Sequence, residues 1–449
     1  MLIACVFLIV VFVLLMSLVS IKNSFLFFLL AMIVVPKINL INLEGTYIGI
    51  RLEDFSLAII VYMSALCIFM KHRNIQWPKF TFPILIYVFV TGISYVMGVL
   101  QGTITDNMLG LMFFLRRVEY FLPFFLAFWM LGKDDLPKIN WIFMWIYLVT
   151  AVVAILQWFQ LIGGFYLGEF VSSVGDRVFS TFSGPYEYAF YLAMSFTYWV
   201  VEYFKKKRSY ILLFLSSCYL LLTLTASRVT IVSVILCSIM AAFLERKART
   251  LILLLITLTA ITCVFYLSVP QNRFSMLFSA KNIPFLGGMI EEQSYDQSVV
   301  RNLEVAGKTD VDISAVYRVI KWNKVLSKFA ESPMLGNGPS AFGEAVDGNY
   351  IRILGENGII SMLAFVWLMY NIVSTSIVAY RAKVSNETTK EISMFVLLIS
   401  GVALFNALFT DVFEASKFAI IYWSLIGIYC RVLIPNEFET LEKNGSKVQ

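Results

Sequence analysis

The sequence has few charged residues: only 14% of its 449 residues are Asp, Glu, Lys or Arg, where a soluble globular chain has about a quarter. This deficit excludes an ordinary soluble domain. Instead, 59% of the residues are hydrophobic, and they form blocks of roughly 20 residues, which is the length that a helix needs to cross a bilayer. A membrane β-barrel would show weakly alternating strands in place of such blocks. The sequence therefore predicts an all-α, polytopic membrane helix bundle with about 12–13 transmembrane helices.

Residues that commonly bind metals are also scarce. The six cysteines lie in or beside apolar segments without CxxC spacing, so we interpret them as small apolar packing residues. The single histidine, His72, lies in a basic cluster beside an apolar segment, as a membrane-flanking charge does. No DxD-like acidic pair accompanies a phosphate-binding loop. We therefore expect no metal and no cofactor.

Basic residues concentrate in short loops that alternate along the chain. Cytoplasmic loops of membrane proteins are enriched in Lys and Arg, so this alternation predicts that these loops share the cytoplasmic side. The N-terminal apolar segment lacks a basic leader and a cleavage site, and we expect it to remain as the first helix. The five basic clusters are Lys71/Arg73/Lys79, Lys133/Lys138, Lys205 to Arg208, Glu245 to Arg249, and Arg381/Lys383/Lys390.

One external loop of roughly 80 residues divides the bundle, and connections longer than about 15 residues are usually functional or disordered. Within it, residues 315–331 place apolar side chains at helical spacing, which predicts an amphipathic helix against the membrane or the bundle. We expect four parts: an N-terminal bundle (1–269), the external loop (270–349), C-terminal transmembrane helices (350–434) and a cytoplasmic tail (435–449).

Charged residues inside an apolar helix are costly and demand a reason. Arg116, Arg117 and Glu119 lie within such a helix, and they cannot share one face because neighbours on a helix are about 100° apart. At least one arginine should point into a polar cavity. The alternative is an internal Arg–Glu pair that only joins helices.

Further ionisable residues gather at external helix ends. Arg177, Arg228 and Arg318 could each be an interfacial arginine, but on one shared face they suit a phosphate or diphosphate. Asp347 opens the helix after the long loop, where it could cap free amides or act as a base. Glu356 lies two and a half turns further on, and a carboxylate there requires a partner, for which the intramembrane arginines are the natural candidates.

At these positions the chain resembles the O-antigen polymerase and ligase family. The resemblance rests on an ordered series of motifs: Arg177 to Pro185, Thr225 to Arg228, Tyr317-Arg318 with Trp322, Gly336-Asn337-Gly338, and Asp347 to Gly358. In family ligases the position of Asp347 is usually a histidine followed by Asn. This chain has Asp347-Gly348, which resembles the polysaccharide polymerase branch.

The resemblance implies a metal-independent, GT-C-like glycosyltransferase of the bacterial inner membrane that joins polyprenyl-diphosphate-linked oligosaccharide repeat units at the periplasmic face. It implies a chain-length regulator protein as a partner and no role for nucleic acid. Arg177, Arg228 and Arg318, with Arg116 or Arg117, would bind the diphosphate, whose growing negative charge needs cations. Asp347 is the first choice of general base and Glu356 the second, with Tyr317, Asn349 and Tyr350 in support.

Three other functions stay open at this point. A ligase differs mainly in its acceptor. A flippase or exporter would enclose similar charges, but transporters commonly show inverted repeats, which this sequence lacks. A peptidoglycan-type polymerase shares the polyprenyl diphosphate, but the contexts of Arg177 and Asp347 resemble that group less.

Overall fold

The computed structural model describes residues 2–37, 39–42, 49–70, 76–166, 169–172, 177–206, 208–268, 313–343, 346–382 and 386–434. The expectations for His72, for most of the long loop and for the tail 435–449 concern residues outside these ranges.

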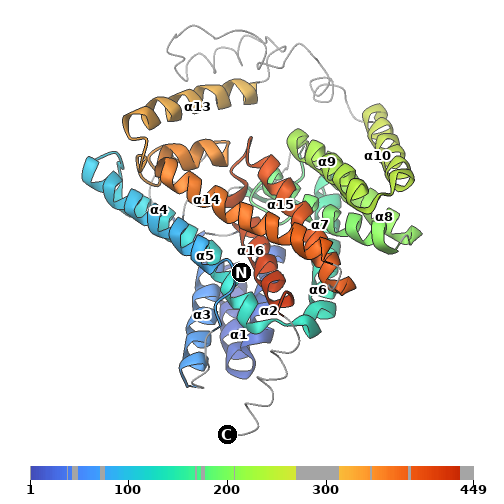
Figure 1. The fold of residues 1–449 in the computed structure, drawn as a ribbon, viewed down its shortest axis with the longest axis horizontal. Coiled ribbons are helices and arrows are strands. Elements are labelled where there is room, and N and C mark those ends of the chain that lie inside the picture. The colour runs from blue at the N-terminus through green and yellow to red at the C-terminus, as the bar shows by residue number, and fades with distance from the viewer. Residues whose placement is uncertain are drawn as a thin grey trace.

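Helices dominate the described part of the chain (Figure 1). They are joined by two short antiparallel hairpins, β1 (Asn39–Asn42) with β2 (Gly49–Arg51) and β3 (Gly164–Tyr166) with β4 (Glu169–Val171), and by the 3-10 turns η1 (Lys133–Asp135) and η3 (Val412–Glu414). The α-helices are α1 (Leu2–Val19), α2 (Ile21–Val34), α3 (Leu52–Met70), α4 (Thr81–Gln101), α5 (Asn107–Met130), α6 (Leu136–Trp158), α7 (Pro185–Lys206), α8 (Ser209–Leu224), α9 (Arg228–Glu245), α10 (Ala248–Ser268), α13 (Ile313–Glu331), α14 (Asn349–Arg381), α15 (Glu387–Asn406) and α16 (Ser416–Val432).

This architecture confirms the predicted all-α helix bundle. Five helical segments of the described chain are both long and apolar enough to span a membrane: those at Thr81–Gln101, Lys133–Trp158, Arg228–Glu245, Asn349–Arg381 and Glu387–Asn406. Other apolar helices are shorter, such as α2 and α8, and α5 carries three charged residues. The total of about 12–13 spans stays a prediction.

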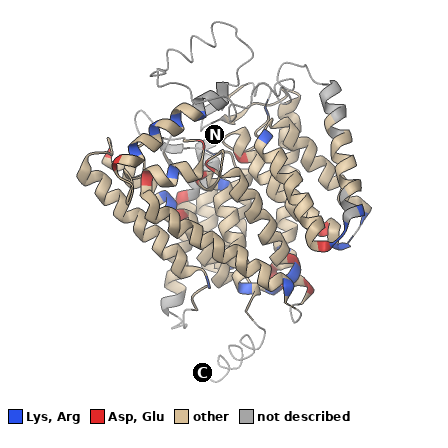
Figure 2. Ribbon diagram, turned by 45° about the horizontal axis from the view of Figure 1, so that its top comes forward, with Lys and Arg blue, Asp and Glu red and all other residues tan. Residues whose placement is uncertain are grey.

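Several of the basic loops meet at one face of the bundle. Lys205, at the end of α7, forms a 2.9 Å ion pair with Glu245, at the end of α9. The Tyr380 hydroxyl of α14 donates to the same carboxylate. Figure 2 shows charged residues gathered toward helix ends, while most helix middles carry none. We call this side of the bundle the basic face.

The opposite face carries α13, which confirms the predicted amphipathic helix over 315–331. Figure 1 shows α13 lying over α14, and Val325 of α13 is buried. Its Trp322 indole donates to the Asp347 carbonyl at the start of α14. The amphipathic pattern thus places one helix across the outer end of another. We call this side the outer face.

Candidate active site

The helix α14 is broken where its charged residues lie. Gly358 has φ +74°, outside the helical region, so the backbone groups on both sides lose their usual helical partners. The loop before α14 supplies replacements: Ile359 N donates to Pro333 O at 2.9 Å, and Gly338 N donates to Glu356 O at 2.7 Å. The break is therefore a fixed feature of the structure, with its backbone groups paired.

Two glycines permit the loop to approach this break. A Cβ on Gly358 would lie 2.2 Å from the Met334 carbonyl oxygen, and a Cβ on Gly336 would lie 2.5 Å from the Glu356 carbonyl. Both residues also have positive φ, which disfavours other side chains. Gly336 belongs to the Gly336-Asn337-Gly338 motif of the sequence, and the structure shows that the turn at this motif fits into the broken helix.

Glu356 lies at the break and is fully buried. Its carboxylate pairs with Arg117 of α5 and with the Nε of Arg352 one helical turn earlier, at 3.3 Å. The prediction that Glu356 requires an intramembrane arginine as its partner is confirmed. A buried carboxylate between two guanidiniums keeps its charge compensated.

Each guanidinium nitrogen of Arg117 has a partner. Nη2 donates to Glu356, Nε donates to Glu414 at 2.9 Å, and Nη1 donates to the Asn357 amide oxygen at 3.1 Å. Its side chain is 4% exposed. Arg117 thus joins α5, α14 and η3 through one buried group. Arg116, its neighbour, lies on another face, where Nη2 donates to Gly49 O at 3.0 Å.

The turn before α14 is held by Asp411, from the loop between α15 and α16. Its carboxylate accepts hydrogen bonds from Val346 N at 3.0 Å and Gly348 N at 3.1 Å, and from Arg352 Nη1 at 3.0 Å. The N-cap of α14 is Gly348, and no side chain caps it. The alternative in which Asp347 caps this helix is wrong, because no side chain caps α14 and the Asn349 amide at its start donates to the Ala407 carbonyl.

Asp347 therefore keeps its carboxylate available. It has φ +59°, and among the described residues no group donates a hydrogen bond to its side chain. Burial and the Asp411 charge raise the pKa of Asp347, while the positive charges of Arg318, Lys321 and Arg352 lower it. A partly buried carboxylate with a raised pKa is typical of a general base.

The three predicted anion-binding arginines differ in their surroundings. Arg318 of α13 is partly buried, and its Nε is a buried donor without a partner in the described structure. Arg177 donates from Nε to Thr225 O at 2.9 Å and lies 4.7 Å from the Tyr186 ring centre, whereas its Nη2 is buried and unpaired there. Arg228 is exposed at the first turn of α9.

The end of α15 connects these elements. Thr230 of α9 donates to the Asn406 amide oxygen at 2.9 Å, and the next carbonyl, of Ala407, accepts from Asn349 N at 2.9 Å. The first turns of α9 and α14 therefore meet at one point of the bundle. Trp322 of α13, four residues after Arg318, donates to the Asp347 carbonyl at 3.2 Å, so the helix that carries Arg318 lies against the start of α14.

The expected support residues have clear positions. Asn349 accepts a 2.9 Å bond from Phe413 N through its side chain, and the Tyr350 hydroxyl donates to Leu404 O at 2.9 Å. Both tie the start of α14 to its neighbours. Tyr317 is part of α13, and its side chain lies outside the described residues.

A second buried charge network lies at the start of α7 and α16. Lys417 is fully buried, and its ammonium donates to the carbonyls of Ile33, Val35 and Thr181. Its backbone N donates to Glu187 at 3.0 Å. This network anchors the motif that follows Arg177 onto the bundle.

No sequence motif predicted a role for Arg352, Asp411, Glu414, Glu187 or Lys417. One signal was present: Arg352 and Glu356 are four residues apart, so they share a helix face. The contacts of Asp411 and Glu414 cross the fold between segments distant in the sequence, and spacing along the chain carries no sign of them.

Comparison with known families bears on this region. Residues 211–366 match the O-antigen ligase family model, Wzy_C. The match confirms the resemblance to the O-antigen polymerase and ligase family, and it supports an enzyme of O-antigen processing in an integral membrane protein. It spans Arg228, Arg318, Asp347 and Glu356, whereas Arg177 lies before it. No curated protein matches the chain.

Proposed function

We propose that the protein is a polymerase that joins polyprenyl-diphosphate-linked oligosaccharide repeat units at the outer face, which we take to be the periplasmic side of the bacterial inner membrane. The observation that carries the proposal is the position of Asp347, whose carboxylate is available where α13, the helix that carries Arg318, contacts the start of α14. A base next to a cation, where the surface helix α13 meets the bundle, suits glycosyl transfer from a lipid diphosphate.

The reaction transfers the glycan from its carrier to an acceptor hydroxyl. The bond between the anomeric carbon and the diphosphate oxygen breaks, the acceptor oxygen forms a new bond to that carbon, and Asp347 takes the hydroxyl proton. The diphosphate leaves with increased negative charge. Within the described residues, Arg318 and Arg177 each have a buried donor nitrogen without a partner, to which an anion can bind, and Arg228 adds a positive charge from α9.

Glu356 and Arg117 take a different role in this proposal. Glu356 is fully buried and held by two arginines, so it has no route to an acceptor hydroxyl. Each guanidinium nitrogen of Arg117 already has a partner. We assign both to positioning α14, and we assign Arg116 to holding β2.

A ligase is the second candidate, because the matched family model is described as O-antigen ligase. The two activities share donor chemistry and differ in the acceptor, which is a second repeat unit for a polymerase and a different lipid for a ligase. A chain-length regulator would be a partner of the polymerase alone.

The two can be separated with purified protein in nanodiscs. Labelled lipid-linked repeat units of the source organism are supplied alone, or together with an unlabelled lipid acceptor of its envelope. A polymerase forms a ladder of products from repeat units alone. A single transfer that occurs only with the lipid acceptor would identify a ligase, and movement of intact lipid across the membrane without transfer would identify a flippase.

A further inference from the structure

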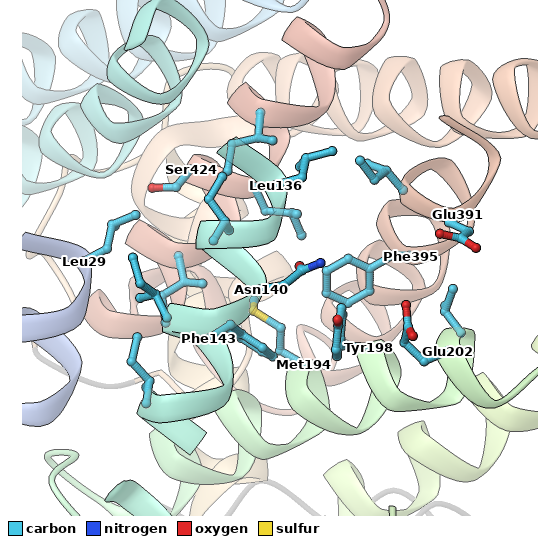
Figure 3. Close-up of a pocket in the computed structure, with 18 of the residues that line it drawn as sticks. Leu29, Leu136, Asn140, Phe143, Met194, Tyr198, Glu202, Glu391, Phe395 and Ser424 are labelled. Atoms are coloured by element: carbon cyan, nitrogen blue, oxygen red, sulfur yellow. The ribbon is translucent and has the colours of Figure 1, made fainter. Parts of the chain in front are cut away.

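A cavity of about 180 Å³ lies between α2, α6, α7, α15 and α16, away from the candidate active site (Figure 3). Nothing in the proposed reaction uses it. Its walls are mostly apolar side chains: Leu29, Ile33, Ile142, Phe143, Met194 and Leu425 are among them.

Aromatic rings form one wall. Tyr198 lies 5.5 Å from Phe143 and 5.8 Å from Phe395, measured between ring centres. Cavities of about 150 Å³ lined by Leu, Ile and Phe stay dry and bind apolar molecules. The walls therefore favour a hydrocarbon group over water.

One end of the cavity is polar. Figure 3 shows Glu202 and Glu391 on the same side of the cavity, opposite Leu29, with Asn140 between that side and Leu29. Glu202 pairs with Lys206 at 2.6 Å. The charges that act on Glu391 are those of Glu202, Lys206, Glu387 and Lys205.

The polar end lies toward the basic face. Glu202 is near the end of α7, Glu391 is near the start of α15, and Asn140 is near the start of α6. Lys205, three residues after Glu202, forms the ion pair with Glu245 that defines this face. The cavity thus has a charged rim at one membrane surface and an apolar interior, which matches the orientation of a phospholipid.

We propose that this cavity binds an aminophospholipid of the leaflet at the basic face, with part of an acyl chain inside and its primary ammonium between Glu391 and Glu202. The phosphate of the same molecule then faces Lys206. This arrangement pairs both charges of a zwitterionic headgroup, whereas an anionic headgroup would bring a phosphate to the two carboxylates without an ammonium to offset them.

Native mass spectrometry of the full-length protein tests the proposal. The detergent-purified chain is incubated with equimolar phosphatidylethanolamine and phosphatidylglycerol of identical acyl chains, and the retained lipid is counted. We expect phosphatidylethanolamine to be preferred roughly two- to fivefold, the range of a partly exposed ion pair. Glu391→Gln removes the preference. Glu331→Gln, an exposed acid of α13 that does not line the cavity, keeps it.

A filling variant tests the acyl part separately. Leu425→Trp adds bulk to the cavity wall and should lower retention of the lipid while leaving the elution volume of the protein unchanged. Equal retention of both lipids by the unmodified protein would overturn the proposal, since annular lipid shows no such choice. The same holds if Glu391→Gln and Glu331→Gln behave alike.

Discussion

Arg352 donates a 3.0 Å hydrogen bond to Asp411, a residue that also holds the backbone amides around Asp347. One carboxylate thus links the buried charge network of α14 to the turn that carries the proposed base. The position of Asp347 is therefore fixed by a residue of the loop between α15 and α16, and changes in that loop should affect catalysis without touching the substrate.

Asp411→Ala tests this link. It leaves Arg352 and the amides of the turn without their acceptor, and breaking a buried ion pair costs about 3–5 kcal/mol. We expect a lower thermal midpoint and a loss of polymer formation. Glu331→Gln, at an exposed acid of α13, serves as the control and should leave both unchanged. An Asp411→Ala protein that is fully active and equally stable would show that the turn does not depend on this contact.

Glu356→Gln separates a positioning role from a catalytic one. The substitution leaves the Arg117 and Arg352 charges partly uncompensated, so the protein should lose several kcal/mol of stability, about 3 by comparison with other buried pairs. The double variant with Arg117→Met should lose less stability than the sum of the two single losses, because the two residues are in contact. Unchanged thermal stability together with complete inactivity would instead make Glu356 catalytic.

Gly358→Ala should be strongly destabilising. The backbone there has φ +74°, and the new Cβ would lie 2.2 Å from the Met334 carbonyl oxygen, so strain adds to a clash. Gly102→Ala is a control with open space around its Cβ position and with φ +68° and ψ +20°, in the left-handed helical region, whereas the ψ of −177° at Gly358 is accessible essentially to glycine alone. It should cost only the backbone strain, about 1 kcal/mol. Comparable losses of thermal stability in the two variants would show that the close approach of the loop adds nothing to the cost of Gly358→Ala.

The pH dependence of the reaction follows from Asp347. A general base acts in its unprotonated form, so the rate should fall as the pH drops through its pKa. Burial and the Asp411 charge raise that pKa. The acid limb of the pH–rate profile, where the rate falls on the acidic side, therefore lies at higher pH than an ordinary aspartate would give. Arg318 lowers the pKa, so Arg318→Gln should shift the limb to still higher pH, whereas Glu331→Gln should not. Rate profiles of the two variants with the same acid limb would contradict the assignment.

Some of this site could be predicted from the sequence. The apolar blocks predicted the helix bundle, and the amphipathic spacing predicted α13. The energetic cost of a lone carboxylate in an apolar helix predicted that Glu356 pairs with an arginine. The order of the motifs also predicted the resemblance to the O-antigen polymerase and ligase family, which the family-model match over residues 211–366 supports.

The remaining contacts depend on tertiary structure. Asp411 meets Arg352 across 59 residues, and Arg117 meets Glu414 across 297. Neither pairing has a local pattern. The break at Gly358 also follows from a loop that inserts beside it, because a glycine in a helix is by itself compatible with a continuous helix.

In the proposed reaction, the Asp347 carboxylate removes the proton of the acceptor hydroxyl. The most direct test is the rate of chain extension by purified Asp347→Asn protein in nanodiscs, with Glu331→Gln as the control and with equal thermal stability of both checked first. We expect the rate with Asp347→Asn to fall by about a hundredfold or more, the range for loss of a general base, while the control extends chains normally. Extension by the Asp347→Asn protein at the rate of the unmodified chain would contradict the account.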